Sequence, residues 1–251
     1  MSDHILIERP EAAPGVQVIR LNRPDKKNAI TRAMYQAMTG ALTAGDADET
    51  VRATVFLGSE SCFSAGNDLN DFLAFATGGT MGREVIDFLH ALAAHGKPLV
   101  SGVDGLAIGI GTTIHLHCDL TYASIRTEFR TPFVDLALVP EAASSLLAPR
   151  LMGHQRAFAL LAAGDGFSAT AARDAGLVYA VVEPAAVERE TLAAAARLAA
   201  KPPKALAIAR TLIRADGVEV ARRIDEEAEH FAAQLKSPEA RAAFEAFVAR
   251  R

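Results

Sequence analysis

A glycine-rich stretch at 97–124 carries the backbone groups best suited to chemistry. Four glycines lie inside it over a span of ten residues: Gly102, Gly105, Gly109 and Gly111. Apolar runs at 99–103 and 120–123 predict two strands, and 110–117 predicts a helix that is packed on both sides. A strand, a glycine turn and a helix start together direct unpaired backbone N–H groups at one point. Such a point can hold a phosphate or a developing oxyanion.

The phosphate alternative corresponds to a dinucleotide-binding fold. Gly109 and Gly111 after a predicted strand supply the first two glycines of a G-x-G-x-x-G motif. Ile114 stands where the third glycine is needed, so the motif is incomplete. The stretch therefore favours an oxyanion site over a dinucleotide site.

Three carboxylates elsewhere have both chemical and structural interpretations. Asp68 and Asp135 are candidate bases, but Asp68 is expected to cap or turn its loop, and Asp135 is equally suited to facing water. Glu141, taken alone, is typical of a carboxylate that stabilises the first turn of a helix through the helix dipole.

Histidines and cysteines give no metal site. His115 and His117 lie two positions apart, so they do not share a helix face, and no cluster of His, Asp and Glu supports them. Cys62 and Cys118 lack metal-ligand spacing and are expected to be small buried side chains.

Composition narrows the class of protein. The chain has 251 residues, half of them apolar, which suits one large domain or a domain with a small appendage. The net charge of −4 and the absence of a Lys/Arg cluster argue against nucleic-acid binding. No apolar run reaches the ~18 residues of a membrane span, and the N-terminus lacks the layout of a signal peptide. We therefore expect a cytoplasmic protein in a reducing compartment, without membrane association.

The remaining patterns predict alternating strands and helices. The predicted strands are a hairpin around Pro14-Gly15 that spans 5–21, then 51–57, 99–103, 120–123, 129–130 and 178–182. The predicted helices are 31–45 with Thr31 as its cap, 83–95, 110–117, one starting at Ser144 or Ser145, 153–163, and 168–175 capped by Ser168. Polar loops at 21–30 and 59–71 and a flexible joint at Gly78-Gly79 separate them. Only Ala-rich helices follow Pro184, so we expect an α/β body and a helical tail.

Four motifs in order along the chain resemble the crotonase superfamily, also called the enoyl-CoA hydratase/isomerase family. They are LNRP…NAI at 21–30, FSAGNDL at 63–69, KPLVSGVDGLAIGIG at 97–111 and CDLTYAS at 118–124. The resemblance covers essentially the whole chain. It implies an α/β fold, a superhelix of ββα units over 1–196 that holds an acyl-CoA site, followed by a C-terminal helical oligomerisation region over 197–251. It also implies a homotrimer or a dimer of trimers.

The same resemblance implies an acyl-CoA thioester substrate, with no cofactor besides the coenzyme A of that substrate. Its carbonyl oxygen is expected between the backbone N–H groups of Asn67 and Ile110, which hold the enolate formed in the reaction. Fixed donors of this kind stabilise developing negative charge. Small residues let the backbone approach the thioester, which explains the following set: Ser64, Ala65, Gly66 and Gly109.

The catalytic carboxylate separates the subfamilies. Hydratases of the family carry two glutamates, and those positions are Thr113 and Phe133 here, so ordinary hydration is in doubt. The stretch 129–149 instead resembles Δ3,Δ2-enoyl-CoA isomerases, whose single catalytic glutamate falls on Glu141. One carboxylate suffices for a 1,3-proton shift from C2 to C4. Apolar neighbours are expected to raise the pKa of Glu141 toward that of a general base.

Substrate contacts complete the expectation. Lys26 or Lys27 is expected to face the CoA phosphates, Ala29 the adenine, and Phe133 the acyl chain. Lys236 and Phe231 are alternative candidates for a further CoA contact. The full set of substrate-binding residues that the resemblance implies is Lys26, Lys27, Ala29, Ser64, Ala65, Gly66, Asp68, Leu69, Gly109, Phe133 and Pro140.

Two other functions stay open at this point. One is a hydratase-like or other crotonase reaction in which Glu141 or Asp135 acts on a water. The other is a CoA-binding protein without turnover. Fatty-acid and aromatic degradation share this scaffold, so the pathway stays open as well.

Overall fold

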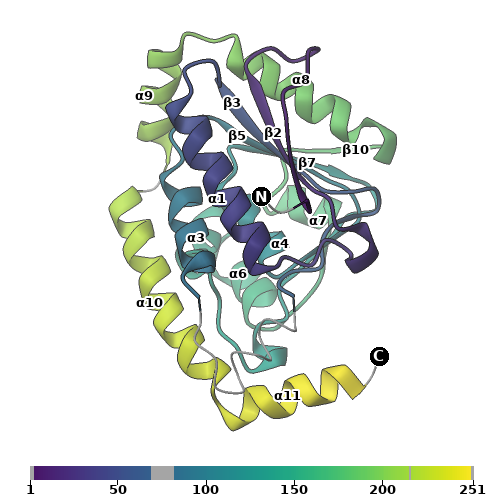
Figure 1. Ribbon diagram of the computed structural model, residues 1–251. Helices are drawn as coiled ribbons and strands as arrows, with labels where there is room; N and C mark the ends of the chain where they lie inside the picture. Colours follow the sequence, from purple (N-terminus) through teal and green to yellow (C-terminus); the bar gives the residue numbers. More distant parts are fainter. Residues whose placement is uncertain (1–2, 69–81, 215, 250–251) are drawn as a thin grey trace.

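The chain folds as a spiral in which short strands alternate between two sheets (Figure 1). The computed structural model describes residues 3–68, 82–214 and 216–249. The predicted joint at Gly78-Gly79 and the predicted substrate contact Leu69 lie outside these residues.

The first sheet has six strands among the described residues. In spatial order they are β1 (Ile5–Glu8), β2 (Val16–Leu21), β3 (Ala53–Leu57), β5 (Leu99–Val103), β7 (Leu120–Ser124) and β10 (Ala180–Val182). The β1–β2 pair is the predicted antiparallel hairpin, and all other neighbours run parallel. Parallel neighbours require crossover connections, which the intervening strands and helices provide.

The second sheet is smaller and supplies the alternate strands of the spiral. Its order is β4 (Cys62–Ser64), β6 (Leu106–Ile108), β8 (Glu128–Arg130) and β9 (Phe167–Ser168). Each of β3, β5 and β7 passes through a short turn into β4, β6 and β8 respectively, so three successive turns of chain stack in parallel. This is the ββα superhelix that the sequence predicts.

Helices close each turn of the spiral. They are α1 (Arg32–Ala47), α3 (Glu84–Ala94), α4 (Ile110–Thr113), α5 (Ser144–Met152), α6 (His154–Leu161), α7 (Ala169–Asp174), α8 (Val187–Ala199), α9 (Pro203–Ile213), α10 (Gly217–Leu235) and α11 (Pro238–Ala249). Short 3-10 segments cover Pro24–Lys26, Ile114–His117, Val134–Leu136 and Pro184–Ala186. The Thr31 and Ser168 side chains accept hydrogen bonds from Met34 N and Ala171 N, which confirms both predicted caps.

Two predicted helices differ from the observed elements. The helix expected at 110–117 is one turn of α-helix followed by a 3-10 turn, because the chain must enter β7 only two residues after His117. The helix expected to start at Ser144 or Ser145 does begin at Ser144, but its cap residue is Ala143, whose side chain offers no acceptor.

The larger sheet lies between two helical layers (Figure 1). Side chains alternate along its strands, so Val55 and Val100 face α8 whereas Phe56 and Leu99 face the main core with α1 and α3. On α8 the buried residues against the sheet include Ala194 and Ala195. Small side chains there let the helix lie close to the strands.

The last helices run along the outside of the α1–α3 layer. Figure 1 shows α9 and α10 following one side of the molecule and α11 crossing its end; α10 packs on α3 and α5. The predicted boundary between 196 and 197 falls inside α8, and the division into two parts stays a prediction. None of the described helices has the length and apolar content that crossing a membrane requires.

The contact between α8 and the sheet leads to a first prediction. Ala194→Leu places a larger side chain where Ala194 is fully buried, and we expect a loss of about 1–3 kcal/mol in the free energy of unfolding. The adjacent Ala193 is exposed, so Ala193→Leu is the matched control. Urea unfolding followed by circular dichroism measures both. Equal midpoints for the two variants would contradict the close packing of α8 on the sheet.

Candidate active site

The loop after β4 packs directly against the glycine turn that starts α4. A Cβ placed on Gly66 would lie 2.9 Å from the Ile108 carbonyl oxygen, and one placed on Gly111 would lie 2.9 Å from the Ser64 carbonyl oxygen. Gly66 and Gly109 also have φ angles of 87° and 57°, which L side chains rarely adopt. Glycine is therefore required where the two segments meet.

Among the described residues, this junction leaves two backbone N–H groups without acceptors. Ile30 and Asn67 form a parallel β-bridge. Its hydrogen bonds use the residues on either side of Asn67: Ile30 N donates to Gly66 O, and Asp68 N donates to Ile30 O. The Asn67 N–H points away from that bridge, and Ile110 N is the first amide of α4. Within residues 3–68, 82–214 and 216–249, neither amide donates to a protein acceptor. Unpaired amides on adjoining loops can stabilise an oxyanion.

Asn28 fixes the β4 loop from the neighbouring 22–30 segment. Its buried side chain has Nδ2 within 2.9 Å of Cys62 O and 3.1 Å of Phe63 O, and its Oδ1 accepts from Arg23 N. The Asn28 carbonyl in turn accepts from Ser64 Oγ. Asn28 adopts a left-handed conformation with φ 52°, which asparagine tolerates better than most residues. Sequence reasoning did not single this residue out.

An ion pair closes the same junction. The Arg23 guanidinium lies 2.6 Å from the Asp68 carboxylate and also donates to the Ala29 carbonyl. Asp68 is buried, and this pairing with Arg23 accounts for its burial. The sequence shows two opposite charges in two loops but no spacing that says they meet.

The predicted substrate-binding residues differ in exposure. Lys26 and Lys27 are exposed, Ala29, Ala65, Gly109 and Pro140 are half-buried, and Ser64, Gly66 and Phe133 are buried. Ala65 N donates to Lys27 O, so the loop with both lysines lies directly beside the small-residue loop.

Glu141 is a buried carboxylate held above α4. It is 7% exposed, and its Oε1 accepts a hydrogen bond from Thr113 Oγ1 at 2.5 Å. Thr113 lies three residues after Ile110, so the hydroxyl that holds the Glu141 carboxylate and the Ile110 amide belong to the same helical turn. Burial raises the pKa of Glu141 to about 8; the Thr113 hydrogen bond opposes this rise, and the charge of Glu227 adds to it. The sequence predicted this direction from the apolar neighbours.

The backbone after Glu141 has an unusual conformation. Ala142 and Ala143 have φ angles of 62° and 54°, and α5 starts immediately afterwards. His117 Nε2 lies 2.7 Å from the Ala142 carbonyl. Because burial lowers the pKa of His117 to about 4, the ring is neutral and its Nε2–H donates to this carbonyl. His117 thus supports the segment that carries Glu141.

The other candidates behave as structural groups. Asp135 is exposed and lies 3.9 Å from Arg130, so it faces water. Burial lowers the pKa of His115 to about 3 and raises the pKa of Cys118 to about 12. The parts of the chain that the structure describes contain no group of His, Cys, Asp and Glu able to hold a metal ion.

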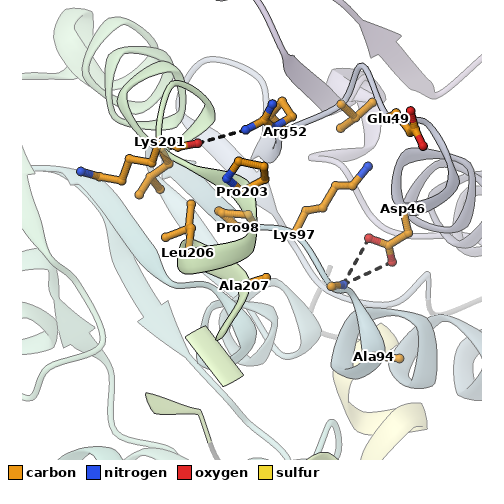
Figure 2. Close-up of a pocket in the computed structure, with 13 residues that line it drawn as sticks. Asp46, Glu49, Arg52, Ala94, Lys97, Pro98, Lys201, Pro203, Leu206 and Ala207 are labelled. Carbon is orange, nitrogen blue, oxygen red and sulfur yellow. Dashed lines mark hydrogen bonds between the residues drawn. The ribbon is translucent and has the colours of Figure 1, made fainter. Parts of the chain in front are cut away.

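A separate pocket of about 640 Å³ lies among the ends of α1, α8 and α9 and the start of β5 (Figure 2). None of the predicted site residues lines it. Three of its charged side chains bond to the chain: Arg52 donates to the Lys201 carbonyl, the Asp46 carboxylate accepts from Gly96 N, and Lys97 donates to the Gly45 and Asp48 carbonyls. Those groups have structural partners, so the candidate site remains at Glu141.

Comparison with known proteins now decides the family. The family model described as enoyl-CoA hydratase/isomerase matches residues 11–251. The chain belongs to the enoyl-CoA hydratase/isomerase family. The solved structure of Pseudomonas aeruginosa OdaA is similar to it with a TM-score of 0.92 and 41% identity, covering 98% of this chain and 99% of that chain. The crotonase fold that the sequence predicts is thereby confirmed.

Similar proteins of the family are named for more than one reaction. The chain is 38% identical over 219 residues to enoyl-CoA delta isomerase 2 of Rattus norvegicus, covering 85% of this chain and 56% of that protein. It is 31% identical over 249 residues to a probable enoyl-CoA hydratase of Rhizobium meliloti, covering 94% of this chain and 92% of that protein. The chain therefore spans little more than half of the rat isomerase, and the choice of reaction rests on the site.

The burial of Glu141 has a consequence for stability that does not depend on activity. Its pKa is about 8 in the folded chain, against an ordinary value of 4.5 for glutamate, so the folded state holds this proton more tightly. The contribution of Glu141 to the free energy of unfolding is therefore fully present below about pH 4.5 and is lost as the pH rises toward about 8. Glu141→Gln removes this dependence. We expect the variant to gain on the order of a few kcal/mol relative to wild type across that interval.

Urea unfolding of both proteins at a series of pH values measures this difference. At the acidic end the two isosteric neutral side chains should give similar stability, which is the internal control. A constant difference across the interval would contradict a protonated, buried Glu141.

Proposed function

We propose that this protein is an acyl-CoA enzyme that stabilises a thioester enolate and acts as a Δ3,Δ2-enoyl-CoA isomerase. The observation that carries the proposal is the single buried carboxylate of Glu141 beside α4, together with the two unpaired amides. Both positions that hold glutamates in hydratases are occupied by other side chains, Thr113 and Phe133. The similarity to rat enoyl-CoA delta isomerase 2 supports the same choice.

The reaction needs one base and one oxyanion site. Glu141 in its ionised form removes a proton from C2 of a 3-enoyl-CoA, and the electron pair moves into a dienolate whose charge lies on the thioester oxygen. The Asn67 and Ile110 amides hold that oxygen. Protonated Glu141 then returns the proton to C4, which gives the trans-2-enoyl-CoA and restores the carboxylate.

The energetics of the site suit this proton shuttle. A pKa of about 8 makes Glu141 a stronger base than an ordinary carboxylate, while an appreciable fraction is still ionised near neutral pH. Loss of one fixed oxyanion donor costs other enzymes about 3–4 kcal/mol of transition-state stabilisation. Two such donors in a site with apolar walls are therefore the main source of rate in this proposal.

Substrate binding follows from the surrounding loops. Lys26 and Lys27 are exposed beside the small-residue loop, where they are available to the CoA phosphates, and Ala29 is available to the adenine. Phe133 is a buried wall for the acyl chain. We further propose cytoplasmic localisation and assembly as a trimer or a dimer of trimers. Four exposed apolar residues at α9 and the start of α10 support that assembly: Ile208, Leu212, Ile213 and Val218.

Hydration is the second candidate, because the similarity to the R. meliloti probable hydratase also favours a family reaction on an enoyl-CoA. It requires a water to be oriented and split, and both positions that hold glutamates in hydratases carry other side chains, Thr113 and Phe133. Incubation with crotonyl-CoA distinguishes the two: a 3-hydroxyacyl-CoA product supports hydration, and a shifted double bond from a 3-enoyl-CoA supports isomerisation. CoA binding without either product would support a non-catalytic role.

Replacement of the base is the direct test of the proposal. Glu141→Gln should lower kcat for 3-enoyl-CoA isomerisation by at least about 100-fold, because it removes the general base while conserving shape. Asp135→Asn, on the exposed carboxylate nearby in sequence, should retain most of the activity. Chromatography of the CoA thioester products measures both. Undiminished isomerisation by Glu141→Gln would remove Glu141 from the mechanism.

A further inference from the structure

A second buried glutamate lies behind the segment that carries Glu141. Glu227 is on α10 and is 5% exposed, although an unpaired carboxylate strongly disfavours burial. It accepts hydrogen bonds from Ser145 N at 2.9 Å and from Ser145 Oγ, both at its Oε1. No local sequence pattern indicates these contacts, because 82 residues separate Ser145 from Glu227.

These donors form the first turn of α5. Ala143, the cap residue of α5, contributes no side-chain acceptor, and the Ser145 amide takes its acceptor from outside the turn. Glu227 supplies that group from α10, and a negative charge is favourable at a helix N-terminus. The carboxylate thus performs the capping that an Asp or Ser would perform within the chain.

The turn that Glu227 caps is also the turn that aims Glu141. The left-handed pair Ala142–Ala143 links the base to α5, and such a pair of non-glycine residues persists only where surrounding contacts hold it. Contacts lie on both sides of the pair in this structure: His117 donates to the Ala142 carbonyl, and Glu227 accepts from Ser145, two residues after Ala143.

We propose that Glu227 is a positioning residue that holds the start of α5 through Ser145, next to the Ala142–Ala143 link, and so aims the Glu141 carboxylate. This inference rests on the proposed function for its kinetic part only. The structural and electrostatic parts concern the protein in the absence of any substrate.

Charged and polar groups on α3, α4 and α10 surround the Glu141–Glu227 pair. The charge of Glu227 raises the pKa of Glu141, and burial raises the pKa of Glu227 itself. Arg223, one turn earlier on α10, donates to Ser145 Oγ and partly compensates Glu227. From α3, His90 pairs with Asp225. On the α4 side Thr113 is the neutral partner of Glu141, and the neutral His117 supports the adjacent carbonyl.

The test compares Glu227→Gln with a matched control on the same two helices. Glu219 on α10 pairs with Arg150 on α5 at 2.8 Å at the surface, so Glu219→Gln also breaks a carboxylate link between α10 and α5. Infrared spectra are recorded over a pH titration for each protein and for the same protein carrying Glu141→Gln. The difference between the two spectra reports the ionisation of Glu141 without any substrate.

We expect Glu227→Gln to lower the ionisation midpoint of Glu141 by about one pH unit, and Glu219→Gln to leave it unchanged. The base limb of the pH–rate profile for 3-enoyl-CoA should move in the same direction. Glu227→Ala, which also removes the cap, should lower kcat by on the order of 100-fold with little change in KM, because the base is misplaced while the CoA loops are untouched.

Failure of the isomerase proposal and failure of the Glu227 proposal would give different results. A wild-type protein inactive on 3-enoyl-CoA would overturn the isomerase proposal, while the infrared titration would still decide the role of Glu227. An unchanged Glu141 midpoint in folded Glu227→Gln, or an equal shift in Glu219→Gln, would overturn the inference. Because Gln keeps the acceptor oxygen for Ser145, that variant serves as the test even if Glu227→Ala does not fold.

Discussion

One constraint governs this molecule: the loop after β4 and the turn before α4 must lie close enough for their backbones to touch. Only glycine fits at Gly66 and Gly111, since a side-chain carbon at either position would approach a carbonyl oxygen of the other segment to 2.9 Å. The stacked strands β4 and β6 bring the two segments together, with a register shift between Cys62 and Ser64. The pairing of β3 with β5 in the larger sheet holds the same two turns of chain side by side. The spiral of strands therefore sets the distance between the two unpaired amides.

Everything else around the site supports that junction. Asn28 and the Arg23–Asp68 ion pair fix the first loop from the side where the CoA contacts are proposed. His117 and Glu227 fix the segment that carries Glu141 from the opposite side. Each of these supporting groups is polar, is fully or largely buried, and has at least one defined partner, so hydrogen bonds hold the site within an apolar interior. Such a site changes little when charge develops on a substrate, which is the condition for electrostatic catalysis.

The sequence predicted the parts of this structure that depend on local pattern. Alternating apolar residues and glycine turns indicated the strands, Thr31 and Ser168 indicated helix starts, and the four motifs indicated the spiral. Contacts between distant residues were not predictable in this way. Arg23 and Asp68 are 45 residues apart, and Ser145 and Glu227 are 82 apart, so nothing in their neighbourhoods reveals that they meet. The start of α5 shows the same limit: serines at 144 and 145 suggested a local cap, whereas the acceptor comes from α10.

The central claim is geometric, and a crystal structure with a bound 3-enoyl-CoA analogue tests it most directly. The account predicts that the thioester oxygen lies about 3 Å from both Asn67 N and Ile110 N. It also predicts that the Glu141 carboxylate faces C2 and C4 on one side of the acyl chain. A thioester oxygen bound elsewhere, or a Glu141 carboxylate turned away from both carbons, would contradict it.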